Sequence, residues 1–322
     1  MSVNPARPKA LLILGMHRSG TSAVTRVVNL LGADIGNNIL LPGHDNSQGF
    51  WEHADAMKSN HYLLQAFGRS WFDIRPLPQH WSQQAAAREA LVGIRAIIQA
   101  EFASRPLIAL KDPRMCLTAP IWIEAFEAAG YDVQCLFVVR DPREVADSLQ
   151  TRENWPREPI FLLWAHYMME AVLATQQYPR ALITYDQLLH DWRGTMQRVS
   201  SELSLAWPRS EAAAAADIDA FLHADHRHHV ATTPFGDDAS LMDMQPFTAE
   251  FYANCLAVAR GKSDWSSLGH CALVLRNISD LYTPHLDNLL IQYERLGHQL
   301  AAKTQAFERL SKMITPDKPP KS

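Results

Sequence analysis

The chain has 322 residues, of which 47% are hydrophobic and 20% charged, and its formal net charge is −4. This size and composition are ordinary for one large globular domain with an appendage, and the weak negative charge gives no reason to expect a nucleic-acid partner. No apolar segment approaches membrane-spanning length, and none at the start resembles a secretory signal. The four cysteines lack metal or disulfide spacing, so we expect a reduced, cytoplasmic protein.

The first predicted unit is a buried strand over residues 10–14, a glycine-bounded loop from Gly15 to Gly20, and a helix over 20–31. In such a unit, free backbone N–H groups and the positive end of the helix dipole converge on one point, which favours a bound anion. The alternative is a strand–helix turn that binds nothing. The donor-rich run from Arg18 to Ser22 favours the phosphate site.

This loop differs from the P-loop that binds ATP. Thr21 follows Gly20 directly, where an ATP-binding loop carries a lysine that reaches the β- and γ-phosphates. Here the cation is Arg18, inside the loop. The N–H groups, Arg18 and the hydroxyls of Ser19, Thr21 and Ser22 suit a terminal 5′-phosphate.

Apolar runs and helical periodicity continue along the chain in alternation, which predicts an α/β fold with a central parallel sheet flanked by helices. Further strands are expected over 107–110, 133–139 and 181–185. Further helices are expected over 54–67, 83–104, 118–129, 142–151, 160–174 and 187–203, and another that ends near Leu222.

A second motif follows the strand over 133–139. Arg140 stands at the carboxyl end of that strand, where α/β sheets bind ligands. Asp141 and Pro142 suit the start of a helix, and Glu144 completes a capping-box pattern. Ser148 lies about two turns into the helix, so Arg140 and Ser148 suit a second phosphate. The alternative is a structural arginine that pairs with carboxylates.

Together the two motifs resemble the sulfotransferase family, nearest to bacterial members that act on carbohydrates or other small hydroxyl acceptors. Residues 15–22 resemble its 5′-phosphosulfate loop, and residues 139–148 resemble its 3′-phosphate motif. The resemblance covers roughly residues 9–205. It also includes Lys111–Arg114, similar to the lysine-containing end of a central strand, and Ile183–Leu189, similar to a later strand–helix segment.

The resemblance implies a P-loop-like fold that binds 3′-phosphoadenosine-5′-phosphosulfate (PAPS), releases adenosine 3′,5′-bisphosphate (PAP) and needs no metal. Two departures are that Arg18 stands where many members carry lysine, and that a C-terminal Arg-Lys-Gly loop is missing. The residues expected to contact the nucleotide are His17, Arg18, Ser19, Gly20, Thr21, Ser22, Arg140 and Ser148.

Sulfuryl transfer builds negative charge on the leaving phosphate and requires a base for the acceptor hydroxyl. Arg18 and Lys111 are expected to stabilise that charge. Glu52 is the first candidate base, by analogy with a catalytic glutamate after the first helix in several sulfotransferase groups. Asp112 is the second, and the remaining candidates are His44, Asp45 and His53.

Structural alternatives exist for the two leading base candidates and for the aromatic residues nearby. Glu52 suits the N-terminus of a helix, and Asp112 suits a turn before Pro113 or a salt bridge to Arg114. The irregular segment 68–82 contains Trp71, Phe72 and Trp81, which either pack in the core or stack against a sugar acceptor.

The C-terminal part, residues 246–322, is expected to form a helical extension beside a main domain over 1–245. Thr283-Pro284 is expected to start a helix over 284–312 with a disordered tail after it. Three roles stay open for its heptad seam: packing on its own domain, homodimerisation, or docking to another protein. Lys303 lies in the seam and makes a coiled coil less favourable. The seam residues are Leu286, Leu289, Tyr293, Leu296, Leu300, Lys303, Phe307 and Leu310.

The histidine-rich run 223–229 fits no standard zinc spacing and is expected to be a basic loop, in which Arg227 replaces the missing C-terminal motif. Two other functions stay open. One is a P-loop small-molecule kinase, disfavoured by the absent lysine and the lack of a clear magnesium-binding aspartate. The other is a non-catalytic nucleotide-binding assembly protein that uses the terminal helix.

Overall fold

The computed structural model describes residues 7–43, 49–222, 235 and 244–314, with side chains as far as residue 310. The chain divides into two compact units, residues 1–276 and 277–322. The expected division after residue 245 falls inside the first unit. There, α11 (Pro246–Ala259) packs against the last strand of the sheet and against α6 (Arg157–Ala174).

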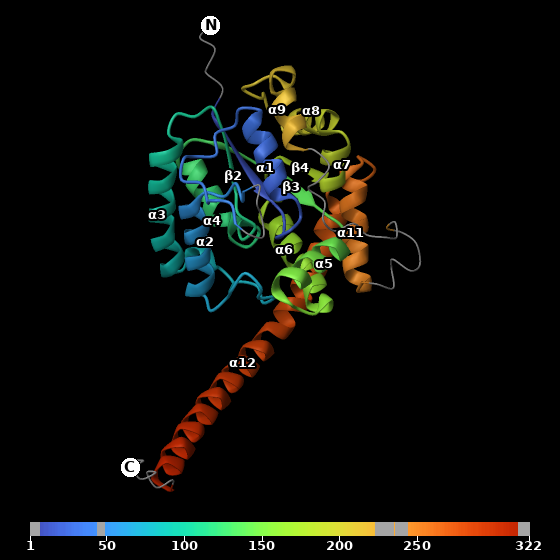
Figure 1. The fold of residues 1–322 in the computed structure, drawn as a ribbon. Coiled ribbons are helices and arrows are strands. Elements are labelled where there is room, and N and C mark those ends of the chain that lie inside the picture. The colour runs from blue at the N-terminus through green and yellow to red at the C-terminus, as the bar shows by residue number, and fades with distance from the viewer. Residues whose placement is uncertain (1–6, 44–48, 223–234, 236–243, 315–322) are drawn as a thin grey trace, which may run out of the picture. The chain divides into compact units, whose positions relative to one another are not determined.

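The first unit is built on a four-stranded parallel sheet with the order β2-β1-β3-β4 (Figure 1). The strands are β1 (Lys9–Leu14), β2 (Leu107–Lys111), β3 (Asp132–Val139) and β4 (Arg180–Thr184). Nearly all of their residues are buried, which explains why these segments read as continuous apolar runs. The α/β fold with a parallel sheet flanked by helices is therefore confirmed.

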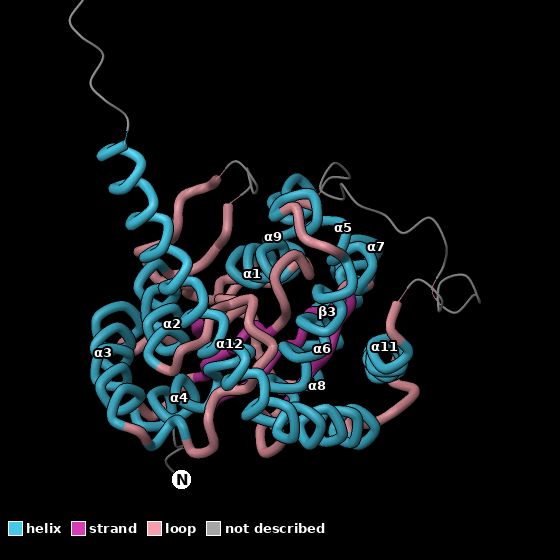
Figure 2. The backbone as a smooth tube through the Cα atoms, turned by 90° about the horizontal axis from the view of Figure 1, so that it is seen from below, coloured by secondary structure: helices cyan, strands magenta, loops and turns pink. Residues whose placement is uncertain are grey.

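Helices enclose the sheet on both faces (Figures 1 and 2). Because side chains alternate along a strand, Leu11 and Ile13 of β1 join one apolar core, while Leu12 and Leu14 join the other. The first core includes α1 (Thr21–Leu30), α7 (Tyr185–His190), α8 (Trp192–Glu202) and α9 (Glu211–Phe221). The second includes α11, α6, α2 (Ala54–Ala66), α3 (Ala85–Phe102), α4 (Met115–Ala128) and α5 (Pro142–Glu153).

The expected helix over 187–203 is wrong, because the chain forms α7 and α8 there instead. Asp191 interrupts the helix with φ −149° and ψ 81°, and its Oδ1 accepts a hydrogen bond of 2.9 Å from the N–H of Gly194. A side chain that caps a new helix start competes with continuation of the old helix. A Cβ at Gly194 would lie 2.3 Å from Asp191 Oδ2, so any side chain there would require the capping carboxylate to shift.

The expected start of the last helix at Pro284 is also wrong. The helix α12 runs over Ser266–Ile314, and Pro284 lies inside it. A proline within a helix removes one backbone donor, and the hydroxyl of Thr283 hydrogen-bonds the carbonyl of Ser279 at 2.7 Å in the same turn. None of the described helices is both long and apolar enough to cross a lipid bilayer.

Candidate functional site

The glycine-bounded loop lies directly against the neighbouring strand and the start of α7. A Cβ at Gly15 would lie 2.4 Å from the carbonyl oxygen of Val138 on β3. A Cβ at Gly20 would lie 2.3 Å from the Tyr185 ring, and Gly20 also has a φ of 87°, which favours glycine. Both glycines are therefore required by close backbone approach, and the loop is held between β3 and Tyr185.

The loop presents polar groups where α1 begins. The first N–H groups of a helix have no partner within it, and the dipole makes this end positive. Arg18 adopts a left-handed backbone with φ 67°. Ser19 is fully buried, and its Oγ has no hydrogen-bond partner among the described residues. A buried hydroxyl without a partner at a helix N-terminus fits a bound oxyanion.

The two predicted phosphate motifs meet in the structure. Arg18 Nε donates a hydrogen bond of 2.8 Å to Ser148 Oγ on α5, and Arg140 Nη1 donates one of 3.3 Å to the carbonyl of Arg18. The Arg140 guanidinium also lies 5.5 Å from the centre of the Tyr185 ring. Arg18, Arg140 and Ser148 thus lie together at the carboxyl ends of β1 and β3.

Arg140 also has the structural role that the sequence left as an alternative. Its Nε pairs with Glu144 Oε2 at 2.7 Å, and both side chains are buried. Asp141 caps α5 by accepting a hydrogen bond of 2.9 Å from the N–H of Arg143, as its position predicted. The Glu144 carboxylate therefore orients Arg140 at the strand end, because a bonded guanidinium loses rotational freedom.

Lys111 ends β2 and connects three segments of the site. Its side chain is almost fully buried. Its Nζ donates to Glu52 Oε1 at 2.7 Å, to the carbonyl of Phe50 at 2.5 Å and to Ser22 Oγ at 3.2 Å. Since Ser22 lies in the first turn of α1, Lys111 supplies a cation near the position where this loop lacks the lysine of an ATP-binding loop.

Glu52 lies within the same cluster and is 8% exposed. Burial raises the pKa of the Glu52 carboxyl, and the nearby charge of Lys111 opposes that shift, while Asp112 adds to it. Its backbone carbonyl accepts a hydrogen bond of 2.8 Å from the N–H of Leu40. Glu52 is therefore held beside Lys111 with its carboxyl shifted toward the protonated form, as a base near neutral pH requires.

Asp112 has several protein partners. Its Oδ1 accepts from the N–H of Arg114 at 3.0 Å and from Arg114 Nη1 at 2.9 Å, and its Oδ2 accepts from Asn60 Nδ2 at 2.9 Å. The amide oxygen of Asn60 in turn accepts from Thr118 Oγ1 and Trp122 Nε1, each at 2.7 Å. These contacts match the turn and salt bridge that the sequence offered as the structural alternative for Asp112.

His17 points from the loop toward aromatic side chains. Its ring centre lies 4.8 Å from that of Trp71 and 5.9 Å from that of Tyr167 on α6. Its Nε2 is buried without a hydrogen-bond partner among the described residues. The pKa of His17 is well below the usual histidine value, chiefly because of burial and further because of the positive charges of Arg114, Arg152, Lys111 and Arg18.

The aromatic residues of the irregular segment have separate surroundings. Trp71 stacks on Trp155 with ring centres 5.2 Å apart, and Phe72 meets both rings edge-on. Phe72 is 53% exposed, whereas Trp81 packs edge-on against Phe67. Trp71, Phe72 and Trp155 therefore form an aromatic cluster, with Trp71 in contact with His17. No sequence pattern pointed to Trp155, because only the tertiary fold brings it to Trp71.

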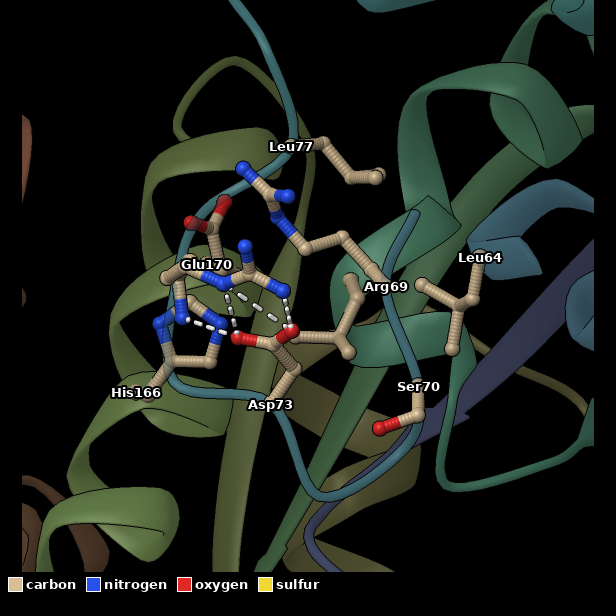
Figure 3. A pocket seen from close by; sticks show the side chains of 9 residues that line it. Leu64, Arg69, Ser70, Asp73, Leu77, His166 and Glu170 are labelled. Atoms are coloured by element: carbon tan, nitrogen blue, oxygen red, sulfur yellow. Dashed lines mark hydrogen bonds and ion pairs between the residues drawn. The ribbon is translucent and has the colours of Figure 1, made fainter. Parts of the chain in front are cut away.

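Polar contacts fix the loop that carries this cluster to α6. The hydroxyl of Tyr167 donates a hydrogen bond of 2.6 Å to the carbonyl of Trp71. Beyond it lies a cavity of about 10 Å³, enough for one water molecule. Figure 3 shows Asp73, His166 and Glu170 among its lining side chains. Burial lowers the pKa of His166 to about 3, so its imidazole is neutral at ordinary pH.

The other candidate bases lie apart from these contacts or outside the described residues. His53 precedes α2, packs against Phe102 and lies 3.8 Å from a Glu101 oxygen. His44, Asp45 and the run 223–229, with Arg227, fall outside the described residues. Within the described parts of the chain, no three His, Cys, Asp or Glu side chains are grouped to hold a metal ion.

No family model matches the chain, and no curated protein matches it either. Three similar solved structures are two sulfotransferase domains and retinol dehydratase. The domain from the curacin biosynthetic pathway is 17% identical with a TM-score of 0.35. The match covers 62% of this chain and 75% of that domain. The domain from the Synechococcus PCC 7002 olefin synthase is 17% identical with a TM-score of 0.42. The match covers 76% of this chain and 95% of that domain.

Retinol dehydratase, solved with androsterone and the inactive cofactor PAP, is 12% identical with a TM-score of 0.33, covering 85% of this chain and 81% of its own. These likenesses are distant and concern the fold. We therefore infer function from the residues of the site.

The Lys111–Glu52 pair provides a direct test of the site's burial. The Lys111→Met variant leaves the Glu52 carboxyl buried without its cation, so we expect the free energy of unfolding to fall by about 3–5 kcal/mol. The double variant Lys111→Met/Glu52→Gln removes the buried charge and should recover part of that loss. Urea unfolding monitored by circular dichroism measures both.

The matched control is Lys58→Met, which breaks an exposed pair with Asp55. Exposed pairs contribute about 0–1 kcal/mol, so this variant should be close to wild type. A Lys111→Met variant as stable as the control would contradict the buried pair.

Proposed function

We propose that this protein is a sulfotransferase that moves a sulfuryl group from PAPS to a hydroxyl or amine of a carbohydrate or other small acceptor. The observation that carries the proposal is the meeting of two anion-binding motifs. Arg18 of the glycine loop bonds Ser148, and Arg140 bonds the backbone of Arg18. A nucleotide with phosphates at both its 5′ and 3′ positions needs two such motifs side by side.

The residues fit this donor. The loop, with Ser19 Oγ buried and lacking a partner among the described residues, suits the 5′-phosphosulfate. Arg140 and Ser148 suit the 3′-phosphate, because a guanidinium fork and a hydroxyl both donate to phosphate oxygens. The nucleotide contacts in this proposal are His17, Arg18, Ser19, Gly20, Thr21, Ser22, Arg140 and Ser148.

When bound, PAPS supplies the sulfuryl group, and PAP leaves with the electrons of the broken sulfur–oxygen bond. Arg18, Lys111 and the loop N–H groups stabilise the negative charge that grows on the 5′-phosphate. Glu52 accepts the proton that the acceptor hydroxyl loses as its oxygen bonds sulfur. Its raised pKa makes it a stronger base than an exposed carboxylate. Asp112 is the second candidate for this proton.

One observation supports the kinase alternative: Lys111 places a cation beside Ser22, close to the glycine loop. That lysine comes from another strand and is paired with Glu52, which differs from a loop lysine held against ATP phosphates. Arg140 and Ser148 also have no task in holding a triphosphate, so we favour the sulfotransferase. A non-catalytic nucleotide-binding protein would show the same nucleotide affinity without transfer.

Calorimetry separates the two enzymes. We expect PAP to bind without metal and more tightly than ATP with magnesium, because only PAP presents a 3′-phosphate to Arg140. Arg140→Ala should weaken PAP binding by about tenfold to a hundredfold, as loss of charge-assisted hydrogen bonds does. Its effect on the affinity for adenosine 5′-phosphosulfate, which lacks the 3′-phosphate, should be much smaller.

The control variant is Arg180→Ala, at the opposite end of the sheet, where β4 begins. Tighter binding of magnesium ATP than of PAP by the wild type would reverse the ranking of the two enzymes. Transfer of labelled sulfate to a library of hydroxylated acceptors would then distinguish the sulfotransferase from a binding protein.

The affinity for PAP should depend on pH through His17. Burial and the four cations around it lower the pKa of His17, and bound phosphates offset those positive charges and raise that pKa. Binding of PAP is therefore coupled to the uptake of a proton by His17. This coupling raises the affinity for PAP as the pH falls from the pKa of His17 in the complex to its lower pKa in the free protein. We expect calorimetry in buffers of different ionisation enthalpy to detect that proton uptake.

PAP phosphates also titrate near pH 6, so the comparison with His17→Asn isolates the imidazole. As the pH falls below about 6.5, the ratio of wild-type to variant affinity should rise. Equal pH dependence of the two proteins would contradict a link between His17 and the bound phosphates.

A further inference from the structure

The second unit is a helix with an exposed apolar surface. Residues 277–314 continue α12 as an uninterrupted helix (Figure 1). Large apolar side chains along it have exposed fractions from 41% at Leu290 to 76% at Tyr293. Exposed apolar side chains in this number on one helix indicate an interaction site. The exposed members are Ile278, Leu281, Tyr282, Leu289, Leu290, Ile291, Tyr293, Leu296, Leu300, Phe307 and Leu310.

Apart from Lys303, apolar residues hold the a and d positions of a heptad repeat from Leu286 to Leu310. The a positions hold residues 286, 293, 300 and 307, and the d positions hold 289, 296, 303 and 310. The flanking e and g positions contain no Asp, Glu, Lys or Arg, so all such residues outside Lys303 lie on the outer b, c and f positions. Charges at e and g normally select a particular partner, and this seam has none.

Charge is divided unevenly between the two halves of the helix. Residues 277–296 contain three acidic and one basic residue, for a net charge of −2. Residues 297–314 contain three basic and one acidic residue, for a net charge of +2. Two such helices attract when the first half of one lies beside the second half of the other, and repel when they run parallel.

We propose that α12 pairs with the same helix of a second copy in antiparallel orientation. With the seam centred on residue 298, Leu286 faces the partner's Leu310, Leu289 faces the partner's Phe307, and Leu296 faces the partner's Leu300. The overlap spans about 36 Å. Every seam position except Tyr293, which faces the partner's Lys303, then meets an apolar side chain of the partner.

Lys303 favours the same orientation. A parallel pair would place Lys303 against the partner's Lys303 inside the apolar seam, where two like charges are unfavourable. In the antiparallel pair, Lys303 faces the partner's Tyr293, and an ammonium group over an aromatic ring is attractive. The lysine that weakens a parallel coiled coil therefore specifies the antiparallel one.

Light scattering after size-exclusion chromatography of the full chain tests the association. We expect a mass of twice 36.2 kDa for wild type. The variant Leu296→Asp/Leu300→Asp should dimerise at least tenfold more weakly, because it places four carboxylates in the centre of the seam. The control Ala301→Asp adds an acid at an outer b position and should dimerise as wild type does. A wild-type mass of 36.2 kDa at micromolar concentration overturns the proposal.

Cysteine cross-linking tests the orientation. The native cysteines are all buried, so Leu289→Cys and Phe307→Cys each add one accessible thiol. An equimolar mixture of the two variants should form the mixed disulfide on mild oxidation, whereas neither alone should cross-link efficiently, since the two thiols must approach within disulfide distance. Efficient disulfides within each variant alone, or no cross-link in the mixture, would overturn the antiparallel arrangement.

Discussion

The site depends on the close approach of the loop after β1 to the end of β3. Gly15 and Gly20 lack side chains where a Cβ would collide with Val138 and Tyr185, so the loop can lie against both. Because β1 and β3 are neighbours in the parallel sheet, this approach brings Arg18 to Ser148 and Arg140, more than 120 positions away. Two anion-binding motifs become one site only through this contact.

The charges around the loop are balanced by buried partners. Glu144 holds Arg140, Glu52 holds Lys111, and Asp112 holds Arg114. Each pair fixes a cation in one orientation, and the loss of solvent around it strengthens its field. The nucleotide binding that we propose would benefit from this arrangement, because the cations are already oriented before the ligand arrives.

Sequence patterns predicted the parts of the fold that local chemistry decides. The buried strands, the loop and the cap at Asp141 follow from apolar runs, glycine spacing and helix-start residues, and the structure contains all of them. The break at Asp191 was missed because a cap inside a helical pattern is a weak signal. Pro284 inside α12 was missed because proline usually begins a helix.

The surroundings of each site residue depended on tertiary contacts that no local pattern contains. Tyr167 and Trp71 pack against His17, and Trp155 and Arg152 pack against Trp71, although these residues come from separate helices and loops. The pairing of Lys111 with Glu52 likewise joins residues 59 positions apart. Motifs in the sequence therefore located the candidate nucleotide site, while its electrostatic state required the folded chain.

A crystal structure with bound PAP tests the central claim most directly. One PAP molecule should place its 5′-phosphate at the loop from Gly15 to Ser22 and its 3′-phosphate at Arg140 and Ser148. Density for PAP elsewhere, or for a nucleotide that touches the loop while its 3′-phosphate points away from Arg140, would contradict the account.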